Sequence, residues 1–151
     1  LAKTLGADEE VVVLAAWLHD LAAVRDPTAQ PDHALLGAEL APQILTPYGY
    51  AEATIGSVAR AIASHSFPLA PGGASPEEVC LSQADGVAQM LRPFYWLYFA
   101  TSIRALAYQE ARSWLAKLLA SKWEALLPAA RRLVGQRYEV TLELLGCEPE
   151  R

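Results

Sequence analysis

An adjacent histidine and aspartate, His19 and Asp20, stand inside a run of apolar residues that extends from Val11 to Ala23. In a helix through this run, the side chains three and four positions from either residue are all apolar, so the pair has no local ionic partner. Burying ionisable groups without a partner is costly. A divalent cation is the simplest partner that satisfies an imidazole and a carboxylate together.

Three further ionisable residues lie on predicted helices: His33, His65 and Asp85. His19, His33 and His65 are all the histidines of the chain, and Asp85 is flanked by apolar neighbours. Each has an ordinary explanation, as a solvated histidine near a helix start, a satisfied core histidine, and a buried partner for an arginine. Taken together, however, they would line one pocket with imidazoles and carboxylates from four helices, which is how metal sites in helical bundles are built.

The sequence predicts an all-α fold in a single domain, because it shows helical periodicity and no sustained alternation, hairpin turn or repeat. The core motifs occupy about residues 1–92, and further helices occupy about 93–146. Residues 1–6 resemble the last turns of a helix that ends at Gly6, so we expect the chain to begin part-way through an element.

Helix signals divide the chain into several predicted elements. They are an apolar helix, central in the fold, from an Asp8 cap to about Val24; a helix from Asp32, with Leu36, Leu40 and Ile44 at spacing four, bent or broken at Pro42; a helix over 51–65 with Ile55, Val58, Ile62 and His65 on its inward face; a helix from the Ser75–Glu78 capping box to about Leu91; a helical region over 93–127; and a last helix from Pro128 to near Gly146.

Composition excludes several classes of protein. Hydrophobic residues make up 53% of the chain, which is enough for a large core, and the net charge of −5 argues against a nucleic-acid polymer as partner. Two cysteines make no disulfide framework, the longest apolar stretch is too short to cross a membrane, and no signal peptide is present. We therefore expect a cytoplasmic protein.

The ordered set of residues resembles the HD-domain metal-dependent phosphohydrolases, in particular the small single-domain branch. The resemblance covers roughly residues 1–92 and rests on His19–Asp20, on His33 followed by Gly37-Ala38-Glu39, on the helix that ends at His65, and on Ala84–Asp85. It implies an HD-domain helical bundle.

The resemblance also implies roles for these residues. His19, Asp20 and Asp85 correspond to metal ligands, and Asp20 would also orient the attacking water. His33 and His65 correspond to histidines that contact a second metal or the substrate phosphate. The family has one more histidine ligand upstream of the pair, which we expect before Leu1, since no histidine precedes His19.

Histidine and carboxylate ligands without cysteine suit Mn, Fe, Ni, Co or Mg. Such an ion activates water and neutralises phosphoryl charge, and His33 and His65 could protonate a leaving group. Arg25 could bind a substrate phosphate, although it is also an ordinary solvated loop arginine.

We therefore expect a hydrolase of phosphoester or phosphoanhydride bonds in a small phosphorylated substrate, a nucleotide. Nucleotide pyrophosphatase, 5′-nucleotidase and cyclic-nucleotide phosphodiesterase activities all fit. The alternatives are a catalytically inactive HD module that binds a nucleotide or protein partner in signalling, and a plain helical interaction domain. A homodimer is a further option, with Trp114, Leu118 and Leu119 facing the partner.

Overall fold

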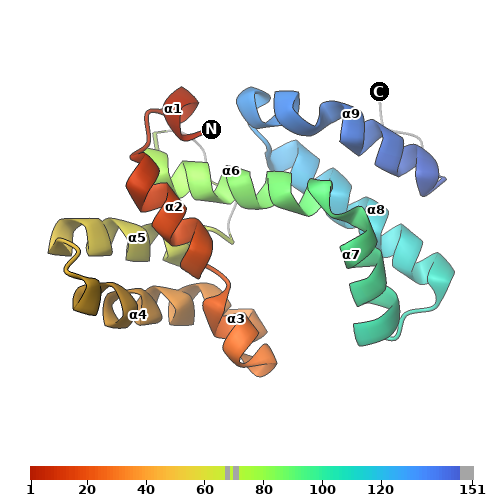
Figure 1. Cartoon of the computed structure of the whole chain (residues 1–151). Helices are drawn as coiled ribbons and strands as arrows, with labels where there is room; N and C mark the ends of the chain where they lie inside the picture. Colours follow the sequence, from red (N-terminus) through yellow and green to blue (C-terminus); the bar gives the residue numbers. More distant parts are fainter. Residues whose placement is uncertain (67–68, 70–71, 147–151) are drawn as a thin grey trace. The chain divides into compact units, whose positions relative to one another are not determined.

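The structure, a computed structural model, describes residues 1–66, 69 and 72–146 (Figure 1). These residues form helices and contain no β-strand, which confirms the predicted all-α class. The α-helices are α1 (Ala2–Leu5), α2 (Glu9–Leu18), α3 (Leu21–Arg25), α4 (His33–Leu45), α5 (Glu52–Ser64), α6 (Pro76–Leu91), α7 (Pro93–Tyr98), α8 (Tyr108–Ala125) and α9 (Pro128–Leu144). Shorter helical segments are the 3-10 helices η1 (Pro27–Asp32) and η2 (Thr46–Tyr48) and the π-helix η3 (Phe99–Ile103).

The predicted helix starts at Asp8 and Ser75 are confirmed by their hydrogen bonds. The Asp8 carboxylate accepts a hydrogen bond from the amide of Glu10 at 2.8 Å. This amide is in the first turn, where N–H groups have no acceptor within the helix. The Ser75 amide donates to the Glu78 carboxylate at 2.9 Å, and the Glu78 amide donates back to the Ser75 hydroxyl at 3.3 Å. This reciprocal pair is the capping box that the sequence predicts.

The helix predicted to run from Asp8 to Val24 is interrupted at His19 and Asp20. Helix α2 ends at Leu18, and α3 begins at Leu21 after Asp20 adopts φ −98° and ψ 4°. The Ala16 carbonyl, which would accept the amide of Asp20 in a continuous helix, accepts Nδ1 of His19 at 2.9 Å instead. The prediction of one continuous helix was wrong, and the break falls at the ionisable pair itself.

Helix α2 is also less buried than its apolar sequence suggests. Its side chains at Val11, Val12 and Ala15 are buried, whereas Trp17 is 83% exposed and Val13 is 55% exposed. The prediction that this helix is central in the fold is therefore wrong for the face that carries Val13 and Trp17.

Helix α4 differs from its prediction in two respects. Pro42 does not break it, because the helix continues to Leu45. Its buried face is made of Ala34, Gly37, Ala41 and Leu45 rather than the stripe at Leu36, Leu40 and Ile44. These mostly small residues let α4 approach α5, the helix against which it packs most extensively.

The chain divides into two compact units, Leu1–Ser82 and Gln83–Arg151, and the boundary falls inside α6. In the first unit, α2, α4 and α5 enclose a core that contains Ala15, Ala41 and Val58, all fully buried. In the second, α8 packs against α7 and α9. That the two units form a single domain stays a prediction. Among the described residues, we find no helix with the length and apolar character that crossing a membrane requires.

Candidate metal centre

The three histidines of the chain all stand where a helical segment ends. His19 follows the last residue of α2, His33 follows η1 and begins α4, and His65 follows the last residue of α5. Backbone carbonyls near a helix end have lost their usual helical partners and need other donors. Helix ends therefore offer each imidazole an acceptor close to its own backbone.

Each imidazole uses its Nδ1 atom to contact the carbonyl of the residue three positions earlier. The distances are 2.9 Å from His19 to Ala16, 2.7 Å from His33 to Gln30, and 2.7 Å from His65 to Ile62. Because a carbonyl oxygen can only accept, these contacts place a proton on Nδ1 in all three rings, so a ring that carries a second proton carries it on Nε2. The Nε2 atoms face the other residues of the site.

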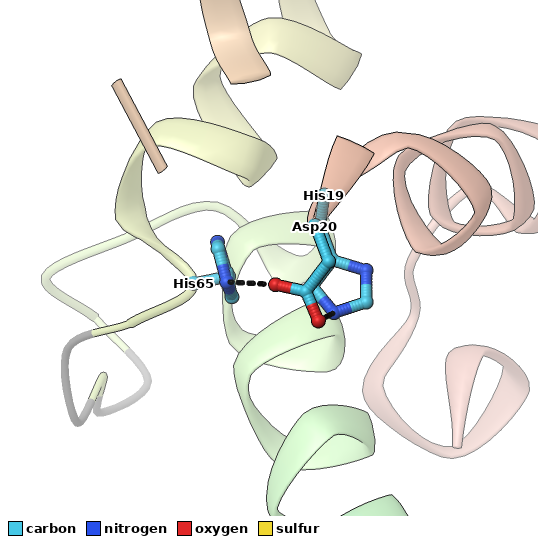
Figure 2. A group of neighbouring side chains, drawn as sticks. All are labelled: His19, Asp20 and His65. Atoms are coloured by element: carbon cyan, nitrogen blue, oxygen red, sulfur yellow. Dashed lines mark ion pairs between the residues drawn. The ribbon is translucent and has the colours of Figure 1, made fainter. Parts of the chain in front are cut away.

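The three Nε2 atoms converge on the carboxylate of Asp20. Nε2 of His19 lies 3.2 Å from Oδ2, and Nε2 of His33 and of His65 lie 3.5 Å and 3.9 Å from Oδ1. Figure 2 shows His65 and His19 on either side of the carboxylate. Nitrogen and oxygen ligand atoms of His19, Asp20 and His65 all lie within 4.8 Å of one another, which is close enough for one metal ion.

The contact between His33 and His65 also suits a cation. Their Nε2 atoms are 3.2 Å apart, and the hydroxyl of Ser66 lies 3.3 Å and 3.4 Å from them. With the proton of each ring on Nδ1, both Nε2 atoms would present lone pairs to each other. A shared proton or a metal ion removes that repulsion, so the residues present fit a divalent metal.

The electrostatics of the site favour positive charge. When its Nε2 is also protonated, His19 donates a hydrogen bond that lowers the pKa of Asp20 below its ordinary value, and the positive charges of the three protonated histidines lower this pKa further, although partial burial opposes them. The carboxylate therefore stays ionised. Helices α2 and α5 also end at the site, where their dipoles place partial negative charge.

Burial differs sharply between the imidazoles and the carboxylate. The side chain of His65 is 3% exposed and that of His33 is 13% exposed, whereas Asp20 is 55% exposed. His33 and His65 are therefore shielded from solvent, and Asp20 lies on the side of the site that a solute can reach.

The structure brings together four of the residues that the sequence singled out, His19, Asp20, His33 and His65. Sequence reasoning missed Ser66, whose only signal was its place directly after His65. Arg25 ends α3 with an exposed side chain, and its predicted contact with a substrate phosphate stays a prediction.

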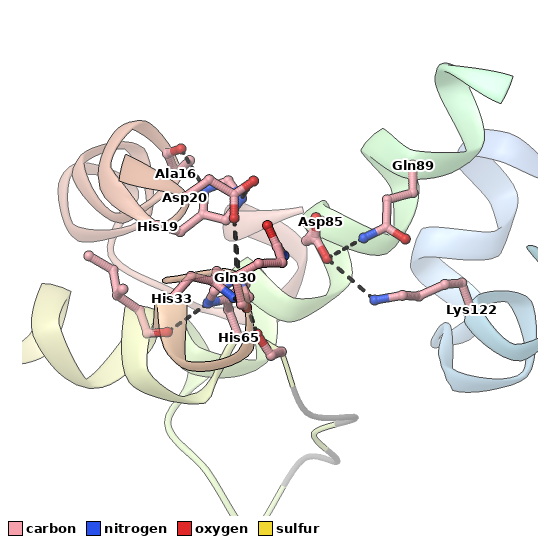
Figure 3. Close-up of polar contacts among 11 residues, drawn as sticks. Ala16, His19, Asp20, Gln30, His33, His65, Asp85, Gln89 and Lys122 are labelled. Carbon is pink, nitrogen blue, oxygen red and sulfur yellow. Dashed lines mark hydrogen bonds and ion pairs between the residues drawn. The ribbon is translucent and has the colours of Figure 1, made fainter. Parts of the chain in front are cut away.

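Asp85 lies on α6, in the part of this helix that belongs to the second unit. Its Oδ2 atom accepts a hydrogen bond from Gln89 at 2.8 Å and lies 3.4 Å from the ammonium of Lys122 (Figure 3). Its role as a metal ligand, which the resemblance implies, stays a prediction.

These features define a helical protein in which three imidazoles surround one carboxylate. A family model, the HD domain, matches residues 1–90, and the chain belongs to this family, within the superfamily of HD-domain metal-dependent phosphohydrolases. HD domains bind divalent metals and are generally metal-dependent hydrolases. No curated protein matched the chain, and neither did any solved structure.

Proposed function

We propose that this protein is a metal-dependent hydrolase of a phosphoester or phosphoanhydride bond in a nucleotide. The observation that carries the proposal is the convergence of three Nε2 atoms on one ionised carboxylate. Membership of the HD family supports the reaction class. The nucleotide is our extension of that class.

His19, Asp20 and His65 would hold the ion, with His33 beside them. When bound, a divalent metal supplies a Lewis acid that activates water and neutralises charge on a phosphoryl oxygen. A set rich in imidazole favours Fe, Co, Ni or Mn over Mg, which prefers oxygen ligands. The ion would also supply the positive charge that a chain of net charge −5 needs to attract an anionic substrate.

The side chains around the ion have the chemistry for hydrolysis. The exposed Asp20 carboxylate can orient a water molecule and accept its proton as the water oxygen attacks phosphorus. As the bond from phosphorus to the leaving oxygen breaks, an imidazolium at His33 can give that oxygen a proton. These steps produce a phosphate product and a protonated leaving group.

The proposal is tested by titrating the purified chain with Mn²⁺, Co²⁺ and Ni²⁺ in a calorimeter, and by assaying phosphate or pyrophosphate release from nucleoside mono-, di- and triphosphates and cyclic nucleotides. We expect metal-dependent release that a chelator stops. Asp20→Ala should abolish turnover, and His33→Ala and His65→Ala should each lower it by about 10²-fold or more. Asp32→Ala, which removes an exposed carboxylate next to His33, is the matched control and should retain turnover.

A second candidate function is a catalytically inactive HD module that binds a nucleotide or a protein partner. The observation that favours it is the pairing of Asp85, the residue that corresponds to a family ligand, with Lys122 and Gln89. Nucleotide binding without metal-dependent hydrolysis of any compound in the panel would establish this module and refute the hydrolase.

A further inference from the structure

Gly37 lies within helix α4, one helical turn after His33. Glycine is a poor helix former, so its presence inside a helix needs a reason. A Cβ atom built on Gly37 would lie 3.0 Å from the carbonyl oxygen of His19 and 3.1 Å from Cγ2 of Ile62. Both distances are shorter than ordinary van der Waals contact between side chains, which begins near 3.4 Å. The absence of a side chain at position 37 is therefore a requirement of packing rather than of backbone conformation.

The two atoms that approach Gly37 belong to the metal centre or hold it in place. The carbonyl of His19 is part of the turn that presents both His19 and Asp20. Ile62 is the residue whose carbonyl binds Nδ1 of His65 at 2.7 Å. Gly37 thus lies where three histidine-bearing elements meet: α4 with His33, the end of α2 with His19, and α5, which His65 follows.

We propose that Gly37 is a positioning residue for the metal centre, an inference that rests on the proposed function. Its missing side chain sets how closely α4 approaches the His19–Asp20 turn and the end of α5. This approach places Nε2 of His33 3.2 Å from Nε2 of His65 and 3.5 Å from Oδ1 of Asp20. A methyl group at position 37 would push α4 outward by a few tenths of an ångström, because a backbone carbonyl cannot turn aside as a flexible side chain can.

The test compares two substitutions of the same chemical type. Gly37→Ala adds the obstructing methyl group. Gly56→Ala is the matched control, because Gly56 is also helical and in the first unit, and a Cβ there would meet only the flexible end of Arg60 at 3.5 Å. Affinities for Co²⁺ and Mn²⁺ are measured by calorimetry, and the imidazole NMR signals of the three histidines are recorded without metal.

We expect Gly37→Ala to fold, to lose about 10- to 100-fold in metal affinity, as supporting residues of metal sites commonly do, and to shift the signals of His19 and His33 in the metal-free protein. Gly56→Ala should match the wild type in both measurements. If Gly37→Ala alone is too unstable, the double variant with Gly56→Ala is compared with Gly56→Ala alone, since the second alanine strengthens α5.

Wild-type affinity in a folded Gly37→Ala protein would overturn the positioning role and leave the proposed function intact. Absence of metal binding by the wild type would instead refute the proposed function and this inference together. If the single and double variants both fail to fold, Gly37 is a requirement of folding, and the positioning role is refuted.

Discussion

Each histidine of the centre makes the same local contact with the backbone, from its Nδ1 atom to the carbonyl three residues before it. The same arrangement occurs on three separate elements, so the site depends on helix ends as much as on residue type. Near a helix end, a carbonyl lacks the amide four residues later as its usual donor and is more open to an imidazole than a carbonyl in the middle of a helix. The break between α2 and α3 is what makes such a carbonyl available to His19.

Asp20 makes the stability of the metal-free protein depend on pH. Because the His19 hydrogen bond and the histidine charges lower the pKa of Asp20 in the folded chain below 3.8, its ionised form stabilises the fold above pH 3.8. That contribution is lost as the pH falls through the folded pKa. Urea titrations should show Asp20→Asn less stable than wild type at pH 5 by about 0.5–1 kcal/mol, since the carboxylate is half-exposed and screened.

At pH 3 the difference between Asp20→Asn and wild type should shrink, because pH 3 lies below 3.8, so the carboxylate of the unfolded chain is largely protonated and folding must release or bury that proton. Asp32→Asn serves as a control with an exposed side chain and should change stability little at either pH. Equal destabilisation by Asp20→Asn at both pH values would show that its carboxylate charge does not stabilise the fold.

At the scale of elements, the capping box at the start of α6 should have a measurable effect on stability. Ser75→Ala removes the hydroxyl that accepts the Glu78 amide at 3.3 Å and leaves that amide without its cap. The free energy of unfolding, measured with urea, should fall by about 1 kcal/mol.

The control for Ser75→Ala is Ser121→Ala, an exposed position inside α8, where alanine is the better helix former. That variant should keep or slightly raise stability. If the two alanine variants behave alike, the cap contributes nothing measurable to the stability of α6.

The element boundaries show which parts of the fold can be predicted from the sequence. The caps at Asp8 and Ser75 were predicted because they depend on residues within one helical turn. The break at His19–Asp20 was not, because the apolar run around it has uniform helical character and carries no local signal for a break. The grouping of the histidines was predicted from their places on separate helices and from the family resemblance, whereas their common use of Nδ1 required the structure.

At the scale of the whole molecule, His19, Asp20, His33 and His65 all belong to the unit Leu1–Ser82. An ion that binds the native state but not the unfolded state stabilises the native state by about 2.7 kcal/mol at a concentration of 100 times Kd. The bound ion should suppress local unfolding most strongly in the elements that carry the ligands.

Hydrogen exchange followed by mass spectrometry, with and without Co²⁺, should therefore show added protection in α2, α4 and α5 and little in α8 and α9. Asp20→Ala treated with the same ion is the control and should show no added protection. Equal protection of both units would contradict a site confined to these ligands. Added protection of residues 83–91 together with the first unit would identify Asp85 as a further ligand, because that part of α6 carries its carboxylate.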